Sequence, residues 1–159
     1  MSSANLQFSF LAKIEVDKLP IIGYLARNMH VYVDRKSAKS RQHTYTRMKK
    51  HLDEGQSIHI FAEGTRNKTA ALLQPFYDGA FKLAIQTQQP IAVVTICNSD
   101  KVSTPKAPFL ASPAQVHCIW DEPISTKGMT LEKDLDHLKA IVHDRILYNL
   151  QNYHANFQL

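Results

Sequence analysis

The chain has 159 residues, of which 44% are hydrophobic, and this is enough to bury the core of one domain. No run approaches the ~20 apolar residues that cross a bilayer, and the N-terminus has no basic region followed by an apolar one, so we expect a soluble or peripheral protein. The net charge of +5 permits an anionic partner such as a phosphate compound, a lipid headgroup or a nucleic acid, although it also serves solubility alone.

The first part of the chain predicts short strands separated by helices. We expect strands at residues 8–14, 30–33 and 57–61, and helices at residues 20–28 and 37–54. Ser37 can cap the second helix, and Gly55 ends it because glycine readily adopts the left-handed conformation found after a helix. Within that helix, apolar residues recur every three or four positions and predict one buried face. They are Ala38, Tyr45, Met48 and Leu52.

The second part of the chain continues the alternation. The expected elements are a loop at 62–75, a helix at 79–88, a strand at 90–96, a loop at 98–113, a strand at 115–120 and a helix opened by Thr130. The run at 90–96 is continuously apolar, which is typical of a strand buried on both faces. Cys97 and Cys118 lie in apolar stretches, so we expect reduced core residues. The last helix carries an apolar stripe of Leu131, Leu135, Leu138 and Val142.

Strands that alternate with helices favour an α/β fold with a mainly parallel sheet and helices on its faces. Such sheets place their chemistry at the carboxyl ends of the strands. Arg35 directly follows one predicted strand, and residues 63–66 follow another. We therefore expect both clusters at the same edge of the sheet.

Two arginines at neighbouring strand ends can form a fork around one phosphate. We expect this role for Arg35 and Arg66, because guanidinium donors match phosphate oxygens in pairs and each such bond contributes roughly 1.5–3 kcal/mol. Gly64 would let backbone amides approach the anion, the Thr65 hydroxyl can donate to it, and Glu63 can orient an arginine or accept a substrate hydroxyl. The alternative is a salt-bridge network of these arginines with neighbouring carboxylates that only holds the loops together.

Residues 35–50 hold seven basic side chains and no acidic one. Each such residue near an anionic membrane can add about 1 kcal/mol, so a membrane surface is an expected partner, with a solvated helix face as the alternative. Nucleic acid is not expected, because no aromatic-interleaved or recognition-helix motif accompanies the charge. None of the eight histidines pairs with Cys, Asp or Glu at metal-ligand spacing, so no metal site is expected either.

Four segments together resemble the glycerolipid acyltransferases, the 1-acyl-glycerol-3-phosphate (lysophosphatidic acid) acyltransferase family. "FLAKIEVDKLPIIGYLARNMHVYVDR" is similar to a block in which a K-E pair precedes P-x-x-G and I-D-R. "FAEGTRN" is similar to F-P-E-G-T-R-S. "LLQPFYDGAFKLAIQTQQPIAVVTI" resembles an F-K-x-G-A segment followed by P-I-V-P-V, and "DEPIST" resembles G-x-P-I-x-T. The segments occur in the family's order over nearly the whole chain.

The resemblance implies a glycerolphosphate-acyltransferase-like fold in a single acyltransferase domain over residues 1–159. It implies acyl transfer from acyl-CoA or acyl-carrier protein to the hydroxyl of a lysophospholipid such as 1-acylglycerol-3-phosphate, in phospholipid biosynthesis. No cofactor is expected beyond that donor, and the expected location is the cytoplasmic face of a membrane. The implied phosphate-binding residues are Arg35, Glu63, Gly64, Thr65 and Arg66, supported by Asp34, Lys13 and Gly79.

One departure from the family concerns catalysis. The family's H-x-x-x-x-D block supplies a histidine base and the aspartate that orients it, and the sequence contains no such block, so we assign no catalytic residue. We expect a chain that lacks an N-terminal segment and that is inactive or weakly active by itself, because a general base contributes roughly 10²–10⁴-fold in rate. The alternative is a non-catalytic phosphate- or lipid-binding relative.

Overall fold

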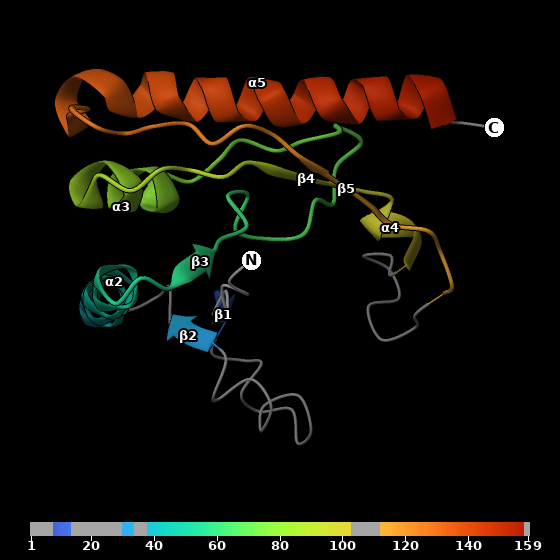
Figure 1. Cartoon of the computed structure of the whole chain (residues 1–159). Coiled ribbons are helices and arrows are strands. Elements are labelled where there is room, and N and C mark those ends of the chain that lie inside the picture. The colour runs from blue at the N-terminus through green and yellow to red at the C-terminus, as the bar shows by residue number, and fades with distance from the viewer. Residues whose placement is uncertain (1–7, 14–29, 34–37, 103–111, 158–159) are drawn as a thin grey trace, which may run out of the picture. The chain divides into compact units, whose positions relative to one another are not determined.

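The computed structural model describes residues 8–13, 30–33, 38–102 and 112–157. The chain divides into two compact units, Met1–Phe61 and Ala62–Leu159, and each is described by itself (Figure 1). The helix expected at residues 20–28 and the helix cap expected at Ser37 lie outside the described residues. The expectation of a single domain over residues 1–159 stays a prediction.

The first unit holds a three-stranded parallel sheet. Strands β1 (Phe8–Lys13), β2 (His30–Val33) and β3 (Ser57–His59) are ordered β2-β1-β3. In the register, Lys13 of β1 lies opposite Val33 of β2, and Phe10 lies opposite His59 of β3. The three predicted strands are therefore confirmed, and their parallel pairing confirms the α/β class for this unit. β3 is two residues shorter than expected because its ladder with β1 ends at Phe10.

Helix α2 (Ala38–Asp53) connects β2 to β3 and packs against both strands. Met48 is buried on the face that the sequence predicts, while Tyr45 and Leu52 are partly buried. Gly55 follows the helix with a φ of +77°, and the amide of Gln56 donates to the carbonyl of His51. Glycine adopts this left-handed conformation without steric cost, so the expected end of the helix is confirmed.

The second unit contains α3 (Gly79–Thr87), β4 (Val94–Cys97), α4 (Ser99–Val102), β5 (His117–Trp120) and α5 (Leu131–Phe157). β4 and β5 form an antiparallel pair, and Ile91 bridges Ile124 beyond its end. Helix α5 runs alongside α3 and β4 (Figure 1). The loop expected at residues 98–113 is wrong at its start, because the Asn98 carbonyl accepts a hydrogen bond from the Lys101 amide and residues 99–102 form a helical turn.

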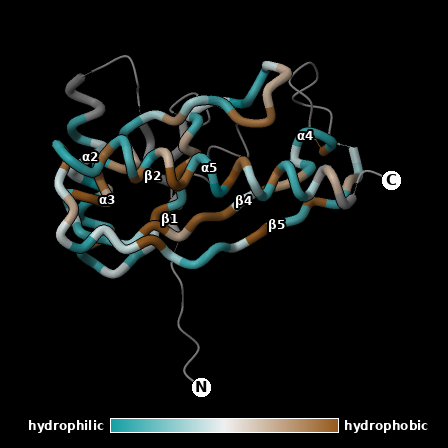
Figure 2. The backbone as a smooth tube through the Cα atoms, turned by 90° about the horizontal axis from the view of Figure 1, so that it is seen from above, coloured by the Kyte–Doolittle hydropathy of each residue, from teal (hydrophilic) through white to brown (hydrophobic). Residues whose placement is uncertain are grey.

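The apolar core of this unit is formed by α3, α5 and the residues that precede α3 and β4. It consists of Phe76, Phe81, Ile85, Val93, Leu138 and Val142. Apolar positions recur along the backbone of β4 and α5 (Figure 2). The predicted stripe of α5 is confirmed, because Leu138 is fully buried and Leu131 and Leu135 pack against the same cluster.

Two predictions about burial are wrong. The run at residues 90–96 is not buried on both faces: Val93 and Thr95 are buried, whereas Ala92 is exposed and Val94 is half-buried. Buried and more exposed residues alternate along this strand because α5 covers only one face of β4. Cys97 shares the buried face, but Cys118 of β5 is exposed and is not a core residue.

Candidate functional site

The expected edge of the sheet is present in the first unit. Because β1, β2 and β3 are parallel, their carboxyl ends at Lys13, Val33 and His59 lie at one edge of the sheet. Lys13 is the last residue of the central strand, and its supporting role stays a prediction. Asp34 and Arg35 follow Val33 directly, but both lie outside the described residues, so the two-arginine fork stays a prediction.

Residues 62–77 form a loop whose two ends are closed on each other. The Tyr77 amide donates to the carbonyl of Ala62, with 2.9 Å between nitrogen and oxygen. One step inside, the Gln74 amide donates to the Oε2 atom of Glu63, also at 2.9 Å. This arrangement confirms the predicted loop and gives it closed ends, as in compact surface loops that carry binding residues.

The E-G-T-R residues lie at the start of this loop. Gly64 has a φ of +67°, a conformation that glycine adopts without strain and that lets the chain turn immediately after Glu63. Glu63 and Gly64 are half-buried, whereas Thr65 and Arg66 are exposed. The loop therefore presents a hydroxyl and a guanidinium at the surface beside an anchored carboxylate. A hydroxyl and a guanidinium are both donors that suit a phosphate.

Asn67 is the residue that the sequence reasoning missed. Its Oδ1 atom accepts hydrogen bonds from the amide and hydroxyl of Thr69 at 2.9 and 2.7 Å and from Nε2 of Gln74 at 2.8 Å. Its Nδ2 atom donates to the Ala71 carbonyl at 2.7 Å. The pattern N-x-T favours an asparagine-based turn and signals the local part of this arrangement. No sequence signal indicates the contact with Gln74.

Gly79 is the first residue of α3 and follows the loop directly. A Cβ atom built there would meet nothing within 4 Å, so the local packing does not require glycine at this position. The expected supporting role of Gly79 stays a prediction.

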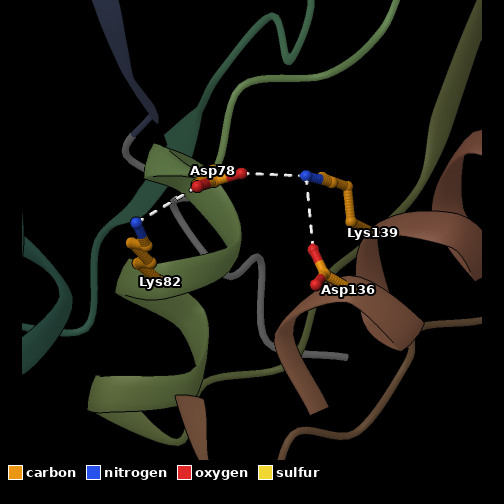
Figure 3. A network of polar contacts seen from close by, with 4 residues as sticks. All are labelled: Asp78, Lys82, Asp136 and Lys139. Atoms are coloured by element: carbon orange, nitrogen blue, oxygen red, sulfur yellow. Dashed lines mark hydrogen bonds and ion pairs between the residues drawn. The ribbon is translucent and has the colours of Figure 1, made fainter. Parts of the chain in front are cut away.

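Asp78, next to Gly79, fixes the far end of the loop to the second unit's helices. Its carboxylate lies 3.1 Å from Nζ of Lys82 in α3 and 2.9 Å from Nζ of Lys139 in α5 (Figure 3). Lys139 also lies 3.5 Å from a carboxylate oxygen of Asp136. The hydrogen bond from Lys139 lowers the pKa of Asp78 below its usual range, and the same bond raises the pKa of Lys139.

A shallow open hollow of about 410 Å³ lies elsewhere in the second unit, beside β5 and the middle of α5. Its lining residues are Asp121, Ile141, Asp144, Arg145, Tyr148 and Asn149. None of them belongs to the E-G-T-R loop. Within the described part of the chain, no group of three or more His, Cys, Asp or Glu side chains is arranged to hold a metal ion, and no helix is long and apolar enough to span a membrane.

Residues 1–98 match the family model described as Acyltransferase. This chain belongs to the acyltransferase family. The matched region contains the parallel sheet, the E-G-T-R loop and α3, so family membership and the candidate site rest on the same part of the chain.

Curated members of this family from distant organisms are similar to the chain. The 1-acyl-sn-glycerol-3-phosphate acyltransferase of Borreliella burgdorferi is 29% identical over 148 residues, which are 91% of this chain and 57% of the relative. The enzyme of the same name from Saccharomyces cerevisiae is 30% identical over 128 residues, 77% of this chain and 41% of the relative. The chain thus spans about half the length of these relatives.

A solved structure shows a similar fold. The crystal structure of the 1-acyl-sn-glycerophosphate (LPA) acyltransferase from Thermotoga maritima superimposes with a TM-score of 0.73 at 21% identity, covering 96% of this chain and 59% of the other. The expected α/β, acyltransferase-like fold is confirmed.

Proposed function

We propose that the chain is the acceptor-binding part of an enzyme that transfers an acyl group to the hydroxyl of a lysophospholipid such as 1-acylglycerol-3-phosphate, in phospholipid biosynthesis. The proposal is supported by membership of the acyltransferase family and by the names of the relatives. The observation that carries it is the closed loop, in which Thr65 and Arg66 are exposed two and three residues after the anchored Glu63. The acyl donor in this proposal is acyl-CoA or acyl-carrier protein.

In the proposed site, Arg66 binds the acceptor phosphate with a pair of charged hydrogen bonds and Thr65 donates a further bond. The second guanidinium that the sequence predicts for this phosphate is that of Arg35. The Glu63 carboxylate fixes the turn through its bond to the Gln74 amide. This arrangement supplies binding and orientation, which act by holding the acceptor hydroxyl in a reactive position.

The basic face of α2 is the proposed contact with an anionic membrane. Arg47, Lys49 and Lys50 are exposed on this helix. A peripheral enzyme on the cytoplasmic face of a membrane would meet anionic lipids there, and each basic residue near the surface adds about 1 kcal/mol to such binding.

The decisive experiment measures binding of a short-chain lysophosphatidate by titration calorimetry. We expect Arg66→Ala to weaken binding by about 1.5–3 kcal/mol, or roughly 10- to 150-fold, because charged hydrogen bonds to the phosphate are lost. Lys68→Ala is the matched control, since it removes one positive charge from the same loop at an exposed position. Equal, small effects of both variants would contradict the proposed site.

A double-mutant cycle tests whether the two arginines hold one phosphate. Arg35→Ala and Arg66→Ala should be non-additive by more than about 0.5 kcal/mol if both side chains contact the same anion. Additive effects would show that Arg35 and Arg66 do not contact the same phosphate.

None of the histidines in the sequence begins an H-x-x-x-x-D block, the pattern that the resemblance implies for the base. We expect measurable acyl transfer once an upstream segment with that block is joined to residues 1–159. Failure of such a protein on a panel of lysophospholipids, with acceptor binding retained, would favour the second candidate function, a non-catalytic binder of phosphate-containing lipids.

A further inference from the structure

We propose that Asn67 and Gln74 are positioning residues, which hold the E-G-T-R turn in the conformation that receives a phosphate. This inference rests on the proposed function. Neither residue binds the anion itself in this proposal. They act through Glu63 and through the backbone on either side of Gly64, Thr65 and Arg66.

Gln74 links the two ends of the E-G-T-R turn. Its backbone amide donates to Glu63 at one end, 2.9 Å from Oε2, and its side-chain Nε2 atom donates to Asn67 at the other end, 2.8 Å from Oδ1. Glu63 and Asn67 flank the three residues Gly64–Arg66. Because Gln74 bonds to both of them, it sets the distance between the two ends of the turn. The three intervening residues are thereby restrained from both sides.

Asn67 holds its own end of the turn rigid. Its carboxamide oxygen accepts from three donors, the Thr69 amide, the Thr69 hydroxyl and Gln74 Nε2, while its nitrogen donates to Ala71. The Thr69 hydroxyl in turn accepts from the Ala71 amide at 3.3 Å. A carboxamide carries both acceptor and donor groups, so it can meet all these partners at once, whereas a hydrophobic side chain meets none.

The restraint matters because Thr65 and Arg66 are exposed. An exposed segment that must be ordered on binding loses conformational entropy at that moment, and this loss weakens the affinity. A turn that is already held at both ends loses less. The bonds of Asn67 to Thr69 and Ala71 are exposed, so we expect them to affect ligand affinity more than global stability.

The family block that this loop resembles has serine where the chain has Asn67. A serine hydroxyl can accept from the amide two residues on, as asparagine does, but it is shorter and carries no amide donor for Ala71. Asn67→Ser is therefore the conservative variant that retains the local turn, and Asn67→Ala is the variant that removes it.

The experiment measures calorimetric binding of a short-chain lysophosphatidate by the full chain and its variants. We expect Asn67→Ala and Gln74→Met to weaken binding about 5- to 20-fold each, and Asn67→Ser to recover part of the loss. The double variant should bind about as tightly as the weaker-binding single variant, because both substitutions remove the same link. Ala70→Ser is the control, since residue 70 lies in the same loop, is exposed and has a methyl side chain that can form no hydrogen bond.

A second readout separates positioning from a general structural role. In the Arg66→Ala background, Asn67→Ala should have a smaller effect on affinity than in the wild type, because the guanidinium is gone and only the Thr65 hydroxyl remains to be positioned. The thermal midpoint of each variant should stay within about 2 °C of the wild type, since surface substitutions change stability little. A fall in midpoint that accounts for the loss of affinity would overturn the inference.

The outcomes distinguish the two levels of the proposal. If Arg66→Ala weakens binding but Asn67→Ala and Gln74→Met do not, the positioning role is overturned while the phosphate site stands. If Arg66→Ala has no effect, the phosphate site and the positioning role fall together, because the turn then positions no ligand. If Asn67→Ala lowers affinity equally in the presence and absence of Arg66, the residue acts elsewhere and the inference is overturned.

Discussion

The backbone amide of Gln74 donates a hydrogen bond to the Glu63 carboxylate, at 2.9 Å and across eleven residues of chain. This contact closes the loop that carries Thr65 and Arg66, and it commits one oxygen of Glu63 to the protein. In the proposed site, the carboxylate of the E-G-T-R sequence is thus a structural anchor as well as a neighbour of the acceptor.

The first prediction concerns that contact. Glu63→Ala should lower the hydrogen-exchange protection of the Gln74 amide by about 10- to 100-fold, because a hydrogen bond to a charged group contributes roughly 1.5–3 kcal/mol. Glu63→Gln keeps an acceptor oxygen and should retain most of the protection. Amide exchange in NMR spectra measures this protection. If the Gln74 amide is equally protected in Glu63→Ala and Glu63→Gln, the bond does not order the loop.

The second prediction concerns a buried hydroxyl. Thr126 is fully buried, and its Oγ1 atom donates toward the carbonyls of Ala84 and Gln89, at 3.2 and 2.9 Å. Thr126→Val leaves these carbonyls at the end of α3 without that donor and should lower the free energy of unfolding by about 1–3 kcal/mol. Urea denaturation measures the loss. Ser125→Ala, at the exposed neighbouring position, should change stability by less than about 0.5 kcal/mol, and an equal effect of both variants would contradict the prediction.

The third prediction concerns the core of the second unit. Leu138 is fully buried in a cluster with Phe81 and Ile85 of α3 and with Val93, so Leu138→Ala should lower the free energy of unfolding by about 2–5 kcal/mol through lost burial and a residual cavity. Lys133→Ala in the exposed part of the same helix is the control. A loss below about 1 kcal/mol for Leu138→Ala, measured by denaturation, would show that α5 does not pack as described.

The fourth prediction is a pH dependence of the Asp78–Lys139 ion pair. The pKa of Asp78 is lowered in the folded protein, so its stabilising contribution is present above the unfolded value of about 3.9 and is lost as the pH falls through the lower, folded value. The pKa of Lys139 is raised, so its contribution is lost only as the pH rises above about 10.4.

The stability difference between wild type and Lys139→Met should therefore be constant from about pH 5 to 9 and should shrink below about pH 4. It should be less than about 1 kcal/mol and decrease with added salt, because both side chains are partly exposed to water. Denaturation at several pH values measures it. A stability difference between wild type and Lys139→Met that grows as the pH falls would contradict the prediction.

The fifth prediction distinguishes the two cysteines. Cys97 is buried and its pKa is raised by that burial, whereas Cys118 is exposed. A thiol reagent at about pH 8 should modify Cys118 quickly and Cys97 only after denaturation, because the thiolate is the reactive form. Cys118→Ser should abolish the fast phase. A fast phase that persists in this variant would place Cys97 at the surface.

Much of the local structure follows from the sequence because its causes lie within a few residues. The glycine that ends α2, the β-branched run of β2 and the apolar stripe of α5 are each set by conformational preference or by periodicity along one segment. All of these predictions are confirmed in the described residues.

Contacts between distant segments needed the tertiary structure. Cys118 lies in an apolar stretch like Cys97, yet α5 covers one face of β4 while Cys118 on β5 remains exposed, and no pattern within either strand contains that information. The bond from Gln74 to Asn67 likewise joins residues seven positions apart through a loop without periodicity. The sequence by itself determined which of the described segments are helix, strand and loop, apart from α4, and it predicts which residues bind a phosphate. Only the folded chain decided which face of each segment is buried and which side chains hold the loop in place, because burial and loop closure depend on what packs from elsewhere in the chain.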